Sequence, residues 1–272
     1  MTSAPHARRR ALVTGASSGI GAATATLLAR EGYAVALLAR REEALTQVIQ
    51  GWSADARARA LPLVADLCDE ASVRAAVASL ESHFDGALDL LVNNAGIGYR
   101  ARVEELELDR VRECLDTNLV GLLQTCRETL PLLRRGHAPV VINVASVVGR
   151  RGIPGQAVYS ASKAAVCSIS EALRLEWAPD GIAVCTLNPA LTATGFFTAQ
   201  ANPSGLPDPD LSDAAGPEDV ATEVLALDRA PRPERNLRWK WRLLGALSVV
   251  APRTADRLLA PRLGGGWRAP RR

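Results

Sequence analysis

The chain has 272 residues, which is long enough to bury the core of one large α/β domain or two small ones. Its formal net charge of +3 is too small to indicate a nucleic-acid partner, and 22% charged residues beside 48% hydrophobic ones is typical of a soluble globular protein. The five cysteines lie far apart without a C-x-x-C pair, and the three histidines are scattered. We therefore expect no disulfide framework and no metal site, and a reducing cytoplasm as the compartment.

The N-terminal "HARRR" followed by "ALV" imitates the start of a secretion signal, but the apolar run breaks at once into "TGASSG". The longest later apolar run, over 243–251, is about half the length of a membrane span. We expect a flexible N-terminal segment over 1–9 and a cytoplasmic protein.

From residue 11 to residue 188, short apolar runs alternate with longer segments of helical pattern. Strands are expected over 11–15, 34–39, 60–65, 88–94, 139–146 and 182–188, and helices near 19–31, 41–52, 69–82, 108–134, 156–178 and 216–227. Several strands are apolar at consecutive positions, as in parallel sheets covered on both faces. The alternation predicts an α/β fold over 10–229, with a doubly wound parallel sheet (Rossmann fold) in three α/β/α layers.

In such a sheet, ligands bind beyond the carboxyl ends of the strands. The chemically suggestive groups all fall at those ends: Gly15 to Gly21, Arg40, Asp66, Asn93 to Gly96, Ser146, and Pro189 to Thr194. We therefore expect one site along this rim.

The first of these groups is the turn "TGASSGIG", between the first strand and the first helix. Glycine permits the tight turn and lets a pyrophosphate approach the backbone, and the helix N-terminus offers N–H donors. Although the spacing differs from G-x-G-x-x-G, the context favours dinucleotide binding over a plain turn. The residues expected at the cofactor here are Gly15, Ser17, Ser18, Gly19, Ile20 and Gly21.

The end of the second strand bears on the choice of dinucleotide. An acidic residue at this point would hold the ribose hydroxyls of NAD, but the sequence "LLARREE" offers Ala39 followed by Arg40 and Arg41. A guanidinium matches a 2′-phosphate, so NADP(H) is favoured over NAD(H). The alternative is that both arginines cap a surface helix beside Glu42 and Glu43.

Two further rim segments have structural alternatives. Asp66 ends the third strand and could be a helix N-cap, although Asp69 and Ser72 are rival caps. The segment "NNAG" at 93–96 ends the fourth strand, where paired Asn could bond to backbone and a small Ala-Gly could admit a ribose.

Tyr159 and Lys163 stand four apart in "AVYSASKAAV", on one face of an expected helix. A neighbouring ammonium lowers the pKa of a phenol, which could then exchange a proton with a substrate oxygen near neutral pH. The alternative for an isolated pair of this kind is an exposed Tyr and Lys on an ordinary helix.

Seven segments, "TGASSGIG", "DL", "NNAG", an Asn in the helix over 108–134, "NVAS", "YSASK" and "NPA", resemble the short-chain dehydrogenase/reductase family in content and order, over residues ~10–195. The resemblance implies that Tyr159 is the catalytic acid/base and that Ser146 bonds the substrate oxygen. It also implies that Lys163 holds the nicotinamide ribose and lowers the pKa of the phenol, and that Asn118 holds a water that relays protons to Lys163.

The resemblance also implies which residues contact each part of the cofactor. It assigns Asp66 and Leu67 to the adenine ring, Asn93, Ala95 and Gly96 to the adjacent ribose, and Pro189, Thr192 and Thr194 to the nicotinamide end. Two features depart from the family: Ala190 replaces the usual glycine after the proline, and the ending "TG…VDGG" is missing. The family further implies a homodimer or homotetramer.

The substrate side follows Pro189. Residues 190–216 are rich in Pro, Gly, Ser and Asp and predict a mobile substrate-binding loop with at most short helical pieces. Phe196 and Phe197, with Tyr99, could line a hydrophobic pocket, or the two Phe could anchor the loop on the core.

Residues 230–272 form a basic, Trp-containing C-terminal extension. It could lie on a membrane surface as a basic amphipathic segment. We favour packing on the same or a neighbouring subunit, closing over the substrate entrance or an interface, with fraying after Gly264, because "APRPERN" and Pro252 break any long helix.

The sequence thus predicts an NADP(H)-dependent oxidoreductase that interconverts a small-molecule carbonyl and a secondary alcohol by hydride transfer. The alternatives are a non-catalytic NADP-binding sensor or scaffold, and an epimerase or dehydratase relative. The intact set of Asn118, Ser146, Tyr159 and Lys163 argues against the sensor. The 83 residues after Pro189 are short for the substrate domain of an epimerase.

Overall fold

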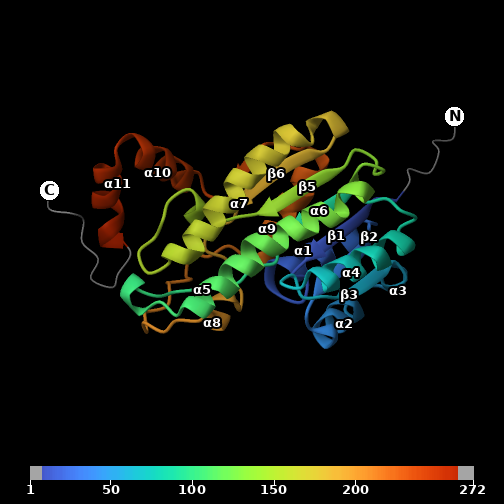
Figure 1. Ribbon diagram of the computed structural model, residues 1–272, viewed down its shortest axis with the longest axis horizontal. Helices are drawn as coiled ribbons and strands as arrows, with labels where there is room; N and C mark the ends of the chain where they lie inside the picture. The colour runs from blue at the N-terminus through green and yellow to red at the C-terminus, as the bar shows by residue number, and fades with distance from the viewer. Residues whose placement is uncertain (1–7, 263–272) are drawn as a thin grey trace.

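The computed structural model describes residues 8–262, so the flexibility expected for residues 1–7 and the fraying expected after Gly264 lie outside the described residues. Seven parallel strands form one sheet in the order β3-β2-β1-β4-β5-β6-β7, with helices on both faces (Figure 1). The predicted doubly wound α/β fold is confirmed. The strands are β1 (Arg10–Thr14), β2 (Ala34–Ala39), β3 (Ala60–Val64), β4 (Leu90–Asn93), β5 (Val140–Val144), β6 (Ala183–Asn188) and β7 (Glu234–Asn236).

The α-helices lie close to their expected positions up to residue 229. They are α1 (Gly19–Arg30), α2 (Glu42–Gln50), α3 (Ala54–Arg57), α4 (Glu70–His83), α5 (Leu108–Leu115), α6 (Gly121–Leu133), α7 (Ala157–Glu176), α8 (Phe196–Ala199), α9 (Pro217–Arg229), α10 (Trp239–Val250) and α11 (Pro252–Leu259). Short 3₁₀ turns cover Val103–Glu105, Val147–Gly149, Ala178–Asp180 and Ala260–Arg262.

The strands have apolar residues at consecutive positions because a hydrophobic core covers each face of the sheet. β4 and β5 are buried along their whole length. One core packs α4, α6 and α7 against one face, around Leu80, Leu133 and Val166. The other packs α1, α2 and α9 against the opposite face, around Leu28 and Val224. Since both faces are dry, strand residues on either side of the sheet must be apolar.

Two backbone features were not expected from the sequence. The helix predicted over 108–134 is interrupted by a π-helical turn at Asp116–Val120, which joins α5 to α6. A seventh strand, β7, extends the sheet beside β6, with Thr186 paired to Glu234 and Asn188 to Asn236. β7 is the polar tripeptide Glu-Arg-Asn, so no apolar pattern in the sequence predicts this strand.

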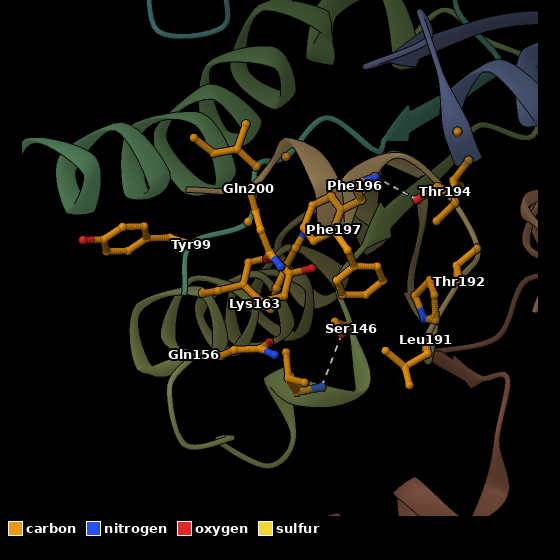
Figure 2. Close-up of a pocket in the computed structure, with 18 of the residues that line it drawn as sticks. Tyr99, Ser146, Gln156, Lys163, Leu191, Thr192, Thr194, Phe196, Phe197 and Gln200 are labelled. Carbon is orange, nitrogen blue, oxygen red and sulfur yellow. Dashed lines mark hydrogen bonds between the residues drawn. The ribbon is translucent and has the colours of Figure 1, made fainter. Parts of the chain in front are cut away.

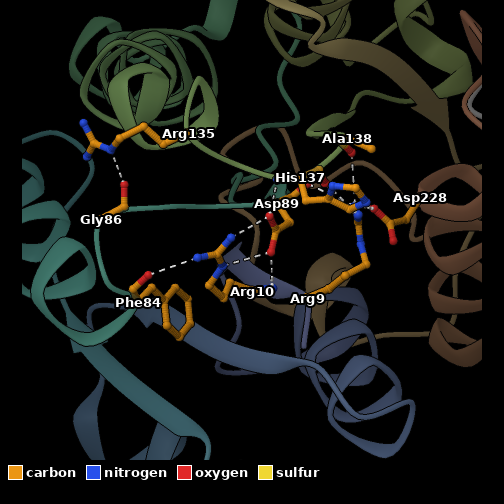
Figure 3. A network of polar contacts seen from close by, with 9 residues as sticks. All are labelled: Arg9, Arg10, Phe84, Gly86, Asp89, Arg135, His137, Ala138 and Asp228. Carbon is orange, nitrogen blue, oxygen red and sulfur yellow. Dashed lines mark hydrogen bonds and ion pairs between the residues drawn. The ribbon is translucent and has the colours of Figure 1, made fainter. Parts of the chain in front are cut away.

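The amino ends of the strands carry a network of ion pairs (Figure 3). Asp89 is buried and accepts hydrogen bonds from the Arg10 guanidinium at 2.9 and 3.0 Å, and from the backbone N–H of Arg10 and His137. Burial alone would raise the pKa of Asp89, but these donors outweigh it and hold the pKa below its usual value.

A second ion pair at the same end ties the start of the chain to α9. Arg9 donates to Asp228 at 2.6 Å, and the Tyr33 hydroxyl donates to the same carboxylate at 2.5 Å. Burial and this hydrogen bond both raise the pKa of Tyr33. Arg9 was expected within a flexible segment; instead it is held by an acid 219 residues away, a contact that local sequence patterns cannot reveal.

The C-terminal extension forms two helices, α10 and α11, which Figure 1 shows as a separate pair at one end of the molecule, in dark red. They pack on the loop after β5: Gly245 lies against Arg150, and Arg151 forms an ion pair with Asp256. A Cβ at Gly245 would lie 3.2 Å from Arg150 Cβ, so glycine permits this close approach. Within residues 8–262, no helix is both long and apolar enough to cross a bilayer.

Candidate active site

A cleft of about 1990 Å³ opens at the carboxyl ends of the strands (Figure 2). It is lined by segments from most of the chain, from the turn after β1 to α11. Nearly all predicted site residues line it: Gly15, Ser17, Ser18, Gly19, Ile20, Arg40, Arg41, Asp66, Leu67, Ala95, Gly96, Tyr99, Ser146, Tyr159, Lys163, Pro189, Thr192, Thr194, Phe196 and Phe197. Gly21, Asn93 and Asn118 are predicted site residues that do not line the cleft.

The glycine-rich turn has the backbone that its sequence requires. Gly15 and Gly19 adopt φ angles of +66° and +52°, in the left-handed region that favours glycine. Gly21 has a different role, because a Cβ there would lie 2.2 Å from the carbonyl oxygen of Gly15. Gly15 and Gly19 therefore shape the cleft wall at the start of α1, whereas Gly21 allows the helix to pack against the turn.

Arg40 and Arg41 both line the cleft where β2 ends, and both are exposed. Arg41 donates to the hydroxyl of Ser17 at 3.3 Å and so leans over the glycine-rich turn. Within residues 8–262, Arg40 has no hydrogen-bond or ion-pair partner. Neither arginine side chain caps α2, since its N-terminus has no side-chain cap.

Asp66 lies on the cleft wall, where its carboxylate accepts a hydrogen bond from the N–H of Cys68 at 2.9 Å. The cap of α4 is Asp69, which accepts from the backbone N–H of Ala71 and Ser72. The alternative reading of Asp66 as the N-cap is therefore wrong, because that position belongs to the rival Asp69.

The segment after β4 separates two asparagines. The amide of Asn93 points into the sheet, donates to Asn143 at 2.9 Å and is buried. Asn94, which the sequence interpretation placed on the rim without assigning it a cofactor contact, lines the cleft and donates to the carbonyl oxygen of Thr14 at 3.0 Å. The side chain of Asn93 thus links β4 to β5. The predicted contact of Asn93 with a ribose stays a prediction, and only the backbone of Asn93 could make it.

Asn118 sits in the π-helical turn and is 1% exposed. Its Oδ1 accepts from Ile97 N at 2.8 Å, and its Nδ2 donates to Ile97 O at 3.0 Å and to Ser162 Oγ at 3.0 Å. A Cβ at Gly96 would lie 3.0 Å from this Oδ1 and 3.3 Å from Lys163 Nζ. Asn118 therefore fixes the floor of the cleft beside Lys163 without reaching the cleft itself.

Tyr159, Lys163 and Ser146 meet near the middle of the cleft. Tyr159 and Lys163 lie one turn apart on α7, with Lys163 Nζ 5.9 Å from the centre of the Tyr159 ring. Lys163 is buried, and its ammonium donates to the carbonyl oxygen of Val144 at 2.9 Å. Ser146 follows β5 and accepts a hydrogen bond from Val148 N. The pair is thus not the exposed Tyr and Lys of an ordinary helix.

The pKa of Tyr159 differs from the value expected from the sequence. Burial raises the pKa of Tyr159, the nearby Cys114 adds to the rise, and a hydrogen bond with Ser146 opposes it only in part. Burial also lowers the pKa of Lys163 to about 8. The pKa of Tyr159 is therefore raised rather than lowered in this structure, because the loss of water around the phenol is the largest influence on it and Lys163 is not among its causes.

The substrate side is formed by the loop after β6. The Phe196 ring lies 5.5 Å from the Tyr159 ring, measured between centres, and packs edge-on against Phe197 at the same separation. Both rings are half-buried and line the cleft. Figure 2 shows Tyr99 pointing away from this group; its hydroxyl accepts from Glu107 N at 2.8 Å within a separate apolar cluster.

Pro189, Thr192 and Thr194, which the resemblance assigns to the nicotinamide end of the cofactor, lie in this loop after β6. Thr194 covers the glycine-rich turn, since a Cβ at Gly19 would lie 3.3 Å from it. The Thr192 hydroxyl donates to Ala190 O at 3.1 Å, and the Pro189 carbonyl accepts from Val147 N at 3.0 Å. The loop thus joins the two halves of the cleft.

Several residues on the cleft wall escaped the sequence interpretation. Gln156, one turn before Tyr159, and Gln200, at the end of α8, are polar examples (Figure 2). The spacing of Gln156 from Tyr159 was a usable signal. The apolar examples are Trp241, Leu244 and Leu247 of α10, whose position depends on the tertiary fold of the extension.

The cleft fits a dinucleotide on its own features. Its glycine turn presents bare backbone at the start of α1, Gly96 leaves the space in front of Lys163 open, and exposed Arg40 supplies a cation beside the turn. In the described part of the chain, no cluster of His, Cys, Asp and Glu is arranged to hold a metal ion.

Known proteins with similar sequences are oxidoreductases. The chain is 40% identical over 200 residues to the uncharacterised oxidoreductase YgfF of Escherichia coli, covering 72% of this chain and 78% of that protein. It is 38% identical over 186 residues to a 3-ketodihydrosphingosine reductase of Bacteroides thetaiotaomicron, covering 68% and 64%. It is 37% identical over 231 residues to a glycine betaine reductase of Emericella nidulans, covering 84% of this chain but only 18% of that much longer protein.

Solved structures with this fold include cofactor complexes. A 3-ketoacyl-(acyl-carrier-protein) reductase of Brucella melitensis in complex with NADH has a TM-score of 0.74 and 30% identity, over 84% of this chain and 96% of that one. A short chain dehydrogenase of Burkholderia cenocepacia in complex with NADP has a TM-score of 0.73 and 30% identity, over 84% and 95%.

The family model for short chain dehydrogenases matches residues 9–204, the segment that carries the sheet up to β6 and every residue of the Tyr159 group. This chain belongs to the short-chain dehydrogenase family of oxidoreductases.

Proposed function

We propose that this oxidoreductase interconverts a carbonyl and a secondary alcohol with NADP(H), with Tyr159 as the acid/base. One observation carries the proposal: the phenol of Tyr159 faces the cleft beside Ser146 and buried Lys163, at the carboxyl end of the sheet. The raised pKa of Tyr159 keeps the phenol protonated at neutral pH, which is the form that can donate to a carbonyl oxygen.

A bound nicotinamide would supply or accept the hydride. The glycine-rich turn, Asp66 and Lys163 are the residues that would hold the dinucleotide. During reduction, Tyr159 gives its proton to the substrate oxygen while the Ser146 hydroxyl donates a hydrogen bond to the same oxygen. Such a fixed donor stabilises the developing charge.

Lys163 has the geometry of a positioning residue. One of its three N–H donors is used by Val144 O, and that bond holds the ammonium at a fixed point behind Tyr159. Its pKa of about 8 lets it carry a proton at neutral pH and release one readily. Asn118 supports this arrangement by fixing Ile97 and Ser162 beside it.

NADP(H) is preferred in the proposal because of Arg40. It is an exposed cation at the end of β2, without a partner among residues 8–262, and the strand end offers no acid. The similar solved structures include both an NADH and an NADP complex, so the preference rests on this chain's own residues.

The walls of the cleft favour a substrate with a substantial apolar portion. Phe196 and Phe197 line it from the loop after β6, and Trp241, Leu244 and Leu247 line it from α10. The similarity to a 3-ketodihydrosphingosine reductase points in the same direction. We therefore propose an amphiphilic ketone, or the matching alcohol, as the substrate class.

We also propose a homodimer or homotetramer. Val120 and Leu123 are both 41% exposed on adjacent turns, and Leu108 nearby is 63% exposed, which leaves apolar surface around α5 and α6. Sedimentation velocity of the purified chain would measure the assembly.

The experiment is a panel of ketones and alcohols from short to long chain, each followed by nicotinamide absorbance with NADPH and with NADH. We expect turnover with NADPH and a kcat/KM that rises with the apolar length of the substrate. NADPH binding without turnover across the whole panel would contradict the proposal and favour a non-catalytic sensor. Faster turnover of short polar ketones would contradict only the substrate class.

A further inference from the structure

We propose that the outward face of α10 and α11 docks on an anionic lipid bilayer. This surface, called the tail face below, consists of Trp239, Leu243, Ala246, Val249 and Val250 of α10 together with Arg253, Arg257 and Leu258 of α11. The proposal does not depend on the proposed reaction, because it concerns the exposed surface of the two helices; of the residues just named, Leu243 and Leu258 also line the cleft.

The tail face is apolar at helical spacing. Trp239, Leu243, Ala246 and Val250 follow one another at intervals of four, three and four residues, so they share one side of α10. Trp239 is 66% exposed, Leu243 58% and Val250 84%. Such a row of large apolar side chains in water indicates a binding surface rather than chance exposure.

The inward side of the same helix is already occupied. Gly245 packs against Arg150, and Trp241, Leu244 and Leu247 line the cleft, which extends to Leu243 at the edge of the tail face. α10 is therefore apolar on two sides, and only one of them is explained by the fold. Figure 1 shows this helix pair standing at one end of the molecule, away from the helices that cover the sheet.

The net positive charge of the two helices favours an anionic partner for the tail face. Between Leu237 and Pro261 there are five cations, at Arg238, Lys240, Arg242, Arg253 and Arg257, and one acid, Asp256. That acid is neutralised by Arg151. Arg253 and Arg257 are exposed and have no ion-pair partner in the described part of the chain.

A second copy of this chain would bring the same cations face to face, which opposes self-association through this surface. An anionic bilayer accommodates both features, since its headgroups attract the arginines and its interface accepts Trp and Leu side chains. The helix pair is too short and too basic to span a membrane, so it would lie in the interface plane.

The test is co-sedimentation of the full chain with vesicles of phosphatidylcholine alone and of phosphatidylcholine mixed with phosphatidylserine. We expect pelleting with the mixed vesicles that decreases as salt is raised, and little pelleting with phosphatidylcholine alone. Far-UV circular dichroism of the same preparation shows that the protein is folded.

Two pairs of variants separate the apolar and the electrostatic contributions. The double variant Val249→Ser with Val250→Ser, at residues 83% and 84% exposed that do not line the cleft, should reduce partitioning about tenfold or more. Leu175→Ser, at an apolar residue 78% exposed on α7, should not change it. Arg253→Glu should also reduce partitioning about tenfold, because it replaces an attraction by a repulsion, whereas Arg30→Glu on α1 should not.

Three outcomes would overturn the proposal. The first is a folded wild-type protein that does not pellet with anionic vesicles at low salt. The second is equal pelleting of the wild type and the Val249/Val250 variant. The third is a concentration-dependent increase in mass that this variant abolishes, without vesicle binding, which would assign the tail face to a second copy.

Discussion

The two ends of the sheet differ in how their charged and polar side chains are paired. At the amino ends of the strands, Asp89 and Asp228 are buried and each is paired with an arginine. At the carboxyl ends, Arg40 has no partner within residues 8–262, and the amide nitrogen of Gln200 is buried without a hydrogen bond. The paired carboxylates hold the structure together, although Arg9 Nε beside them is buried without a hydrogen bond. The unpaired groups that line the cleft remain available to a ligand.

The largest expected difference comes from removing one phenol hydroxyl at each end. Tyr159→Phe should reduce kcat about 10³-fold with little change in NADPH affinity, because the hydroxyl acts on the substrate oxygen. Tyr33→Phe should leave kcat unchanged but lower the free energy of unfolding by about 2 kcal/mol, because Asp228 loses a hydrogen bond. Stopped-flow turnover and urea unfolding of both variants measure this; a Tyr159→Phe protein that keeps a tenth of the wild-type kcat would show that another group is the acid/base.

Asp89→Asn should be the most destabilising single change at the amino end. It leaves Arg10 without its charge partner and should lower the free energy of unfolding by about 3 kcal/mol. Activity per folded molecule should not change.

The same residue predicts how stability depends on pH. Because the pKa of Asp89 is lower in the folded protein, its stabilising contribution is complete above its unfolded pKa and is lost as pH falls through the folded value. Urea unfolding of wild type and variant across acidic pH measures this contribution. A gap between the two curves that stays constant down to pH 3 would refute the assignment.

The pH profile of the reduction should report Lys163. Its pKa is about 8, so kcat/KM should fall about tenfold per pH unit above that value as the ammonium is lost. Lys163→Arg, which keeps its charge to much higher pH, should retain reduced activity and move the decline upward. A decline near pH 8 that is the same in both proteins would belong to another group.

The smallest effect is expected for cofactor choice. Arg40→Ala should raise the KM for NADPH about tenfold and leave the kinetics with NADH nearly unchanged, because only the 2′-phosphate contact is lost. Arg30→Ala, an exposed cation on α1 outside the cleft, is the matched control. Equal weakening with both cofactors would mean that Arg40 does not recognise the 2′-phosphate.

The rim of the cleft could be predicted from the sequence because parallel strands place all their carboxyl ends on one edge. Short apolar runs located those ends within a few residues, so Gly15, Ser146 and Pro189 were assigned to the same edge and line the same cleft. The family resemblance then separated Tyr159 and Lys163 from ordinary surface residues.

The remaining features depend on contacts that no local pattern encodes. β7 is polar and exists because it pairs with β6, and Arg9 is fixed by an acid at the far end of the chain. The direction of a side chain is equally hidden: Asn93 turns into the sheet, while Asn94 beside it faces the cleft. The pKa of Tyr159 depends on how much water the folded site excludes, which a four-residue spacing does not reveal.

The order of elements along the chain determines when each wall of the cleft forms during synthesis. The glycine-rich turn, Ser146, Tyr159 and Lys163 have all been synthesised once β6 and the segment up to Thr194 have left the ribosome, while Phe196, which packs on Tyr159, and α9, which packs with α1, follow later. The wall formed by Trp241, Leu244 and Leu247 arrives some fifty residues later, on the order of several seconds at ordinary rates of translation. A nascent chain therefore carries the residues proposed to hold a nucleotide before it carries the wall proposed to enclose a substrate.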